Sequence, residues 1–245
     1  MGKVDNVALD RARVLLFGQD SKATGVSVLH LQGKYYLTQK DFDTAIEQLQ
    51  QAVRLAPESA QLQSDLGAAL LGKIERDRQT ERGPRQADVN DCLLHLNEAL
   101  RLTPDLPEAL FNRALLQQRE RLRREAKADW EHYLRLDAQS GWAEEARLNL
   151  NEIEATLNKV GLRKEQLYRQ LLDAWSRQDA DSALQAVSFS YSLNGNALVG
   201  KLLDEFLAAW SARDRNQAEE RLQVLQYIGR LTLERQKDRF FSDVV

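Results

Sequence analysis

The residues of this chain that could act as a nucleophile or a general base are few and scattered. Cys92 is the only cysteine, and the three histidines are His30, His95 and His132. A cysteine hydrolase needs an exposed thiol whose pKa is lowered by a neighbouring histidine. The three histidines do not converge in the sequence, so they predict no nucleophile–base pair.

Motifs for metal or phosphate chemistry are absent from the sequence as well. No HExxH, CxxC, P-loop or GxSxG string occurs, and no glycine cluster could cradle a phosphate. The carboxylate pairs Glu144-Glu145 and Glu219-Glu220 occupy polar positions of predicted helices, and we interpret them as solvated faces. We therefore predict a protein that is not an enzyme and has no cofactor, metal site or small-molecule substrate.

The charge balance argues against nucleic acid as a partner. The 245 residues carry 34 Lys and Arg against 37 Asp and Glu, a net charge of −3, whereas nucleic-acid-binding domains are usually strongly basic. The basic run between Arg119 and Lys127 is interleaved with acids and lacks aromatic side chains for base stacking. That run is typical of a solvated helix.

Cysteine content and hydropathy predict a cytoplasmic protein with no membrane partner. A single cysteine excludes a disulfide framework and fits a reducing compartment. The N-terminal apolar run Val14–Phe17 is too short for a signal peptide, and no stretch approaches the length of a membrane span. The apolar end of the chain, Arg239–Val245, suggests that a further domain could follow.

Helical periodicity runs through the chain and predicts an all-α fold. Only four prolines occur, and none follows Pro107, so long stretches are free of this helix breaker. Apolar residues recur at spacings of three and four, as in Ile46, Leu49 and Val53. The best strand candidate, Val187–Tyr191, is short and flanked by helical pattern.

A pattern of small and large residues recurs along the first half of the chain at a spacing of 34. An insertion of 13 residues splits the second copy, and the third copy follows in the same register. Small residues let two antiparallel helices approach closely, while larger ones fill the space between pairs. The copies are Gly33, Tyr36, Ala45, Leu49, Ala52 and Pro57; Gly67, Leu70, Cys92, Leu96, Ala99 and Pro104; and Ala114, Ala126, Trp130, Tyr133 and Ala138.

The segment from Val26 to Ala138 resembles three tetratricopeptide repeats, a family of stacked helical hairpins that form an α-solenoid. Cys92 stands where the other copies have alanine, so we interpret it as a small packing residue. The departures are Leu70 and Gln117 at the aromatic position, and Ala138 at the terminal proline.

The third copy also has a narrower resemblance. Its segments Glu108–Leu116, Trp130–Asp137 and Ser140–Arg147 resemble the repeat region of bacterial proteins in which tetratricopeptide repeats precede a CHAT domain, a caspase-like cysteine peptidase. The resemblance implies a regulatory repeat region. The peptidase dyad itself matches no residue here.

We expect four regions: an N-terminal helix and linker at 1–25, three repeats at 26–140, a capping helix at 141–160 that ends at Gly161, and C-terminal hairpins at 161–245. The insertion near 74–87 is interpreted as an extended helix and an exposed loop. The C-terminal helices are expected at 162–177, 180–191, 196–212 and 215–237, with Asp179 and Asp181 as N-caps.

Stacked hairpins present a concave groove lined by the first helix of each pair, and the residues that packing leaves free there are candidates for binding a protein or peptide. Some of them could instead touch the C-terminal helices. The candidates are His30, Lys34, Leu37, Gln61, Ser64, Ala68, Leu71, Phe111, Asn112, Leu115, Gln118 and Arg119.

The groove does not fit the carboxylate clamp of chaperone-binding members of the family. Asp65 and Glu108 stand where that clamp needs hydrogen-bond donors. We predict a non-catalytic protein-interaction module. The alternative is a stand-alone structural scaffold or assembly factor whose repeats form oligomers, and the sequence leaves the oligomeric state open.

Overall fold

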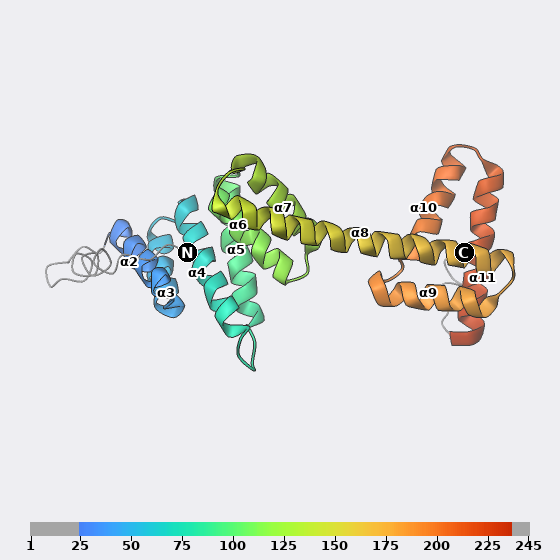
Figure 1. Cartoon of the computed structure of the whole chain (residues 1–245), viewed down its shortest axis with the longest axis horizontal. Helices are drawn as coiled ribbons and strands as arrows, with labels where there is room; N and C mark the ends of the chain where they lie inside the picture. Colours follow the sequence, from blue (N-terminus) through green and yellow to red (C-terminus); the bar gives the residue numbers. More distant parts are fainter. Residues whose placement is uncertain (1–24, 237–245) are drawn as a thin grey trace. The chain divides into compact units, whose positions relative to one another are not determined.

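The computed structural model describes residues 25–236, and within them every regular element is a helix (Figure 1). The all-α prediction is confirmed, whereas the helix expected before residue 25 lies outside the described residues. The chain divides into unit 1, up to Glu154, and unit 2, from Ala155. The helices are α2 (Val26–Thr38), α3 (Phe42–Leu55), α4 (Ala60–Asp77), α5 (Gln86–Leu102), α6 (Pro107–Arg119), α7 (Arg123–Leu136), α8 (Gly141–Ser176), α9 (Ala180–Asn194), α10 (Ala197–Ser211) and α11 (Arg215–Gln236).

Unit 1 is built from three antiparallel helical pairs: α2 with α3, α4 with α5, and α6 with α7. Each pair also contacts the next, through α3 with α4 and α5 with α6. The first helices of successive pairs contact one another as well, α2 with α4 and α4 with α6. This is the stacking expected of a helical repeat solenoid.

Glycine sets the separation of the helices in the first two pairs. A Cβ atom built on Gly33 would lie 2.5 Å from Cγ of Leu49, and one on Gly67 would lie 2.6 Å from Cδ2 of Leu96. In the third pair Ala114 and Trp130 hold the equivalent positions, and both are fully buried. The predicted register of small and large residues is therefore confirmed.

Replacing Gly67 with alanine is expected to destabilise unit 1 by about 1–3 kcal/mol, because the new methyl group would overlap the buried Leu96 side chain. Gly161 is the matched control, since it is also helical but has nothing within 4 Å of a built Cβ. Gly161→Ala should stabilise its helix by about 0.5–1 kcal/mol. Hydrogen exchange in α4 and α8 measures both changes in stability. If Gly67→Ala and Gly161→Ala changed stability equally, the close contact between Gly67 and Leu96 would be contradicted.

The insertion in the second pair has the structure expected of it. Helix α4 has 18 residues where α2 and α6 have 13 each, and a loop then leads to α5. Gly83 in this loop adopts a positive φ of 64°, a conformation that favours glycine. Arg78 at the base of the loop forms ion pairs with Glu75 and with Glu120 at the end of α6.

Helix α8 corrects the prediction that a capping helix ends at Gly161. It continues without interruption from Gly141 to Ser176. One glycine in a helix costs about 1 kcal/mol relative to alanine, and residues 162–172 contain neither proline nor a Ser, Thr, Asp or Asn side chain that could cap a new helix. The local cost is therefore too small to break the helix.

The turns after α8 and α10 in unit 2 have the same geometry as the turns after α2 and α6 in unit 1. Gln178 and Arg213 have positive φ values of 56° and 61°, like Lys40 and Arg121 in unit 1. In each turn the next amide donates to a carbonyl five residues earlier, as from Asp179 to Ala174. The repeated motif Ala174-Trp175 and Ala209-Trp210 thus precedes equivalent turns, which supports interpreting α8–α9 and α10–α11 as helical hairpins.

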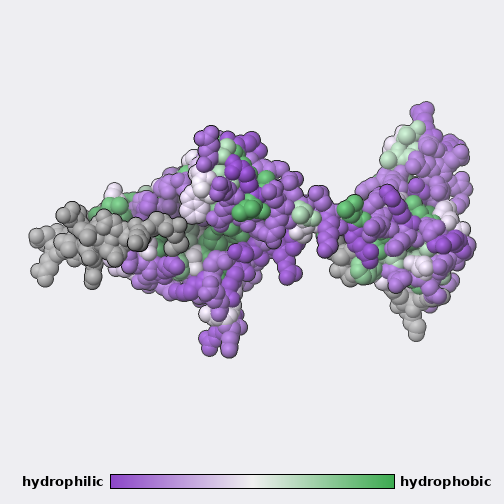
Figure 2. Space-filling view, viewed as in Figure 1, coloured by the Kyte–Doolittle hydropathy of each residue, from purple (hydrophilic) through white to green (hydrophobic). Residues whose placement is uncertain are grey.

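Unit 2 has its own hydrophobic core, formed by residues of all four helices, including Leu171, Val187, Leu202 and Val224. Asp179 caps α9 by accepting a hydrogen bond from the Ser182 amide at 3.1 Å, as predicted, whereas Asp181, also expected as an N-cap, lies inside the first turn of α9. Figure 2 shows a surface that is mostly hydrophilic, with small apolar patches. Within residues 25–236, no helix combines the length and apolar character that crossing a membrane requires.

Candidate partner-binding site

The residues that could carry out catalysis are held in structural contacts. Cys92 is fully buried, its thiol lies 3.2 Å from the Gly67 carbonyl oxygen, and burial raises its pKa to about 12. His95 contacts the side-chain oxygen of Gln63 at 2.7 Å, and burial lowers its pKa. His132 pairs with Asp105 at 2.7 Å. The interpretation of Cys92 as a packing residue is therefore confirmed.

Three of the polar side chains near the first two repeats belong to one internal network. Asp65 on α4 lies 2.5 Å from the His30 Nε2 on α2, and its other oxygen accepts from Gln61 at 3.1 Å. His30 and Gln61 were predicted to face a partner. The structure instead engages both with Asp65, so this network joins α2 to α4.

Two predicted binding residues of the second repeat lie in the interior, which corrects the prediction for them. Ser64 is fully buried and Leu71 is almost so, leaving neither a useful surface for a partner. Ala68 and Leu37 are half-buried and Lys34 is exposed, so these three remain accessible.

At the end of α6, Gln118 and Arg119 also have internal partners. The Trp130 indole N–H donates to the Gln118 side-chain oxygen at 3.1 Å, and the Gln118 amide donates to Asn149 on α8 at the same distance. Arg119 is 3.7 Å from Glu75 on α4. Gln118 therefore joins the third pair to α8, and Arg119 is tied to the preceding repeat.

The other predicted residues of α6, Phe111, Asn112 and Leu115, come together in a cavity of about 570 Å³ in unit 1. We call this cavity the α6 pocket. Helices α7 and α8 complete it with residues that were not predicted as binding residues. Its lining is Pro107, Glu108, Phe111, Asn112, Leu115, Tyr133, Asp137, Trp142 and Glu145.

Aromatic rings form the apolar wall of the α6 pocket. Phe111 is 6% exposed, and its ring packs edge-to-face at 4.9 Å from Trp130, 5.3 Å from Tyr133 and 5.2 Å from Trp142. Trp142 itself is 61% exposed. Phe111 therefore supports the wall, and Trp142 supplies most of the aromatic surface that a partner can reach.

Sequence reasoning missed Trp142 as a binding residue because it assigned the whole of the following helix to covering the third repeat. The spacing of the alanines in this helix could have identified Trp142 as exposed. Ala143 and Ala146 are both fully buried, so Trp142 and Glu145, each one position earlier, lie off the buried stripe.

Asp137 lines the pocket as an ionised carboxylate whose oxygens already accept hydrogen bonds from neighbouring residues. It accepts hydrogen bonds from the Ser140 hydroxyl, from the Tyr133 hydroxyl at 2.7 Å and from the Ser140 amide at 3.1 Å. These bonds hold the pKa of Asp137 far below its usual range. Burial, the bond to Asp137 and the charge of Glu108 raise the pKa of Tyr133. Glu108 lines the same pocket.

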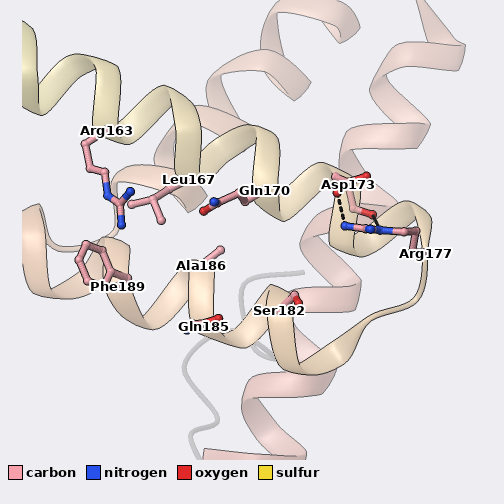
Figure 3. Close-up of a pocket in the computed structure, with 9 residues that line it drawn as sticks. All are labelled: Arg163, Leu167, Gln170, Asp173, Arg177, Ser182, Gln185, Ala186 and Phe189. Carbon is pink, nitrogen blue, oxygen red and sulfur yellow. Dashed lines mark hydrogen bonds and ion pairs between the residues drawn. The ribbon is translucent and has the colours of Figure 1, made fainter.

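A second cavity, of about 470 Å³, lies in unit 2 between α8 and α9 (Figure 3). At one end Arg163 lies over the Phe189 ring, 4.8 Å from its centroid, and at the other end Arg177 pairs with Asp173. Both arginines therefore already have partners. Among the described residues, no cluster of three or more His, Cys, Asp or Glu side chains could hold a metal ion.

Residues 26–59 match the tetratricopeptide repeat family model. This match spans α2, α3 and the turn after them, which is the helical pair that the sequence pattern predicts as the first repeat. No curated protein sequence matches the chain.

Solved structures with helical repeats are similar to part of the chain. The first TPR of Spaghetti (RPAP3), bound to the HSP90 peptide SRMEEVD, is 21% identical with a TM-score of 0.45, covering 56% of this chain and 98% of that one. The TPR2B domain of yeast Sti1, in an Hsp70 complex, is 19% identical with a TM-score of 0.45, covering 54% and 97%. A thermophilic TPR protein of Thermus thermophilus is 20% identical with a TM-score of 0.49, covering 75% and 92%.

Proposed function

We propose that the chain is a non-catalytic protein-interaction module that binds a peptide segment, of another protein or of a neighbouring domain, at the α6 pocket. The observation that carries this proposal is the 61% exposed Trp142 at the wall of a 570 Å³ cavity. Large aromatic side chains at the centre of a binding surface contribute most of the affinity in many interfaces. Leu115 extends the same apolar wall along α6, and the buried Phe111 ring supports it.

The accessible remainder of the predicted groove belongs to the same proposal. Lys34, Leu37 and Ala68 lie on α2 and α4, which contact one another in the same layer of first helices as α6. An extended peptide anchored at the α6 pocket would continue along these two helices. Its main contacts would be apolar, because His30 and Gln61 are held by Asp65.

We propose further that the partner is a caspase-like peptidase domain, which the repeat region would hold or regulate in the cytoplasm. The support for this is the resemblance of segments Glu108–Leu116, Trp130–Asp137 and Ser140–Arg147 to repeat regions that precede CHAT domains. All three segments contribute residues to the α6 pocket. They include Phe111 from the first segment, Tyr133 and Asp137 from the second, and Trp142 and Glu145 from the last.

The proposal is tested by selecting peptides from a random display library on the full chain and measuring their affinity by fluorescence anisotropy. Replacing Trp142 with alanine should weaken the selected peptides about ten-fold or more, the usual loss at an interface hot spot. Trp210→Ala is the matched control, because Trp210 is similarly exposed, at 65%, but lies in unit 2. It should leave the affinity unchanged.

Two results would overturn the proposal. The first is a library from which the full chain selects no peptide. The second is a set of peptides that bind Trp142→Ala as tightly as the original chain, which would move binding away from the α6 pocket. If Trp142→Ala abolished self-association of the chain but left peptide affinity unchanged, the oligomeric scaffold would be favoured instead.

A further inference from the structure

The charged residues that line the α6 pocket are all acidic. Three of its lining residues are carboxylates, Glu108, Asp137 and Glu145, and no lysine, arginine or histidine lines it. An apolar partner side chain would need only the aromatic wall. Three carboxylates around that wall are complementary to a cation and would repel a partner's carboxylate.

Two of these carboxylates are available to a partner. Asp137 already accepts hydrogen bonds from Tyr133 and Ser140. Glu108 and Glu145 are both exposed, and neither forms a hydrogen bond or ion pair with any of residues 25–236. The pocket therefore offers two unpaired acceptor groups in addition to its apolar wall.

Each free carboxylate stands one helical turn from an aromatic ring of the pocket. Glu108 precedes Phe111 by three residues on α6, and Glu145 follows Trp142 by three residues on α8, so each pair shares a helix face. Both helices thus bring an acid and an aromatic ring to the same cavity. Such a combination suits a guanidinium, which is planar, is weakly hydrated, stacks on aromatic rings and donates to carboxylates.

We infer that the α6 pocket receives an arginine side chain of the partner peptide, with the apolar stem against Leu115 and Trp142 and the guanidinium between Glu108 and Glu145. This inference rests on the proposed function and specifies its partner as a basic segment. A lysine fits less well, because its compact ammonium is strongly hydrated and stacks poorly. A peptide that ends in acidic residues would be repelled.

The experiment repeats the peptide selection on the full chain and on two double variants of equal charge change. Glu108→Gln/Glu145→Gln removes the two free carboxylates without changing their shape. Glu144→Gln/Glu152→Gln is the matched control, since both residues are exposed on α8 and neither lines the pocket. Thermal unfolding followed by circular dichroism verifies that all three proteins are equally folded.

Arginine should be enriched at one fixed position of the peptides selected by the original chain and the control. Replacing that arginine with citrulline, its neutral isostere, should weaken binding to both proteins about ten-fold. The same replacement should have little effect on binding to Glu108→Gln/Glu145→Gln, because the charges that recognise the guanidinium are then absent.

The other outcomes separate this inference from the proposed function. Peptides that need Trp142 but show no arginine preference would overturn the inference and leave the proposed function standing. Equal affinity for lysine and arginine at the fixed position would overturn the assignment of a guanidinium. Failure to select any peptide would overturn both proposals.

Discussion

The Trp130→Ala variant is expected to lose about 4 kcal/mol of unit 1 stability, within the range measured for removing a buried aromatic side chain. Trp130 is fully buried in α7, and its ring packs 4.9 Å from Phe111 and 6.5 Å from Tyr133 between centroids. Its indole N–H also donates to Gln118. The substitution therefore leaves a cavity and deprives the Gln118 oxygen of its donor.

Denaturant unfolding followed by circular dichroism, with hydrogen exchange to assign the loss to unit 1, measures this effect. Trp142→Ala is the control in the same unit, because it removes the same side chain from a position that is 61% exposed. We expect it to cost about 1 kcal/mol, the value of its edge-to-face contact with Phe111. Similar losses for the two variants would show that Trp130 does not hold the third pair together.

The Trp130→Ala substitution should also disturb the α6 pocket. Phe111 rests against both Trp130 and Trp142, so removing the buried ring removes the support of the exposed one. Phe111→Glu would likewise disturb the core, because Phe111 is only 6% exposed. Trp142→Ala is therefore the cleaner test of binding.

The second large effect is expected at Asp88, the centre of an ion network between α4 and α5. Its carboxylate accepts from Lys73 at 2.9 Å and from Arg85 at 3.0 and 2.8 Å, and the Asp88 and Lys73 side chains are only 7% and 12% exposed. Asp88→Asn should lower the stability of unit 1 by about 3 kcal/mol, because it removes the carboxylate to which the largely buried Lys73 ammonium is bonded.

The loss at Asp88 should depend on pH in a defined direction. Burial by itself raises the pKa of Asp88, but the hydrogen bonds from Arg85 and Lys73 outweigh it and bring the pKa below its usual value. The unfolded chain then binds a proton more readily than the folded one. The contribution of Asp88 is therefore complete above the unfolded pKa of about 3.9 and is lost as the pH falls through the folded pKa.

Unfolding measured from pH 7 to pH 2 compares the original chain with Asp88→Asn and with Asp43→Asn. The difference between the original chain and Asp88→Asn should be constant at neutral pH and shrink below about pH 4. Asp43 is 60% exposed where it pairs with Arg76, so its replacement should cost less than about 1 kcal/mol. A difference at Asp88 that persists unchanged to pH 2 would contradict a charge-based role.

The contacts within each helical pair could be predicted from the sequence because they repeat. Gly33 meets Leu49 and Gly67 meets Leu96 in the same geometry, so one packing rule leaves its mark at a spacing of 34 residues despite the insertion. The burial of Cys92 followed from the same register. The helix boundary expected at Gly161 was wrong because a single glycine is a weak local signal.

The binding surface, by contrast, is decided by tertiary structure. Whether His30 is free depends on Asp65, 35 residues later in the chain, and Ser64 is buried by neighbours that the repeat register does not specify. The α6 pocket exists because α8 brings Trp142 and Glu145 to Phe111. The sequence by itself determined the all-α fold and the packing inside each pair, since those contacts recur with a fixed period. Only the tertiary structure decided which polar and aromatic side chains stay free, because that depends on single contacts between helices that do not recur.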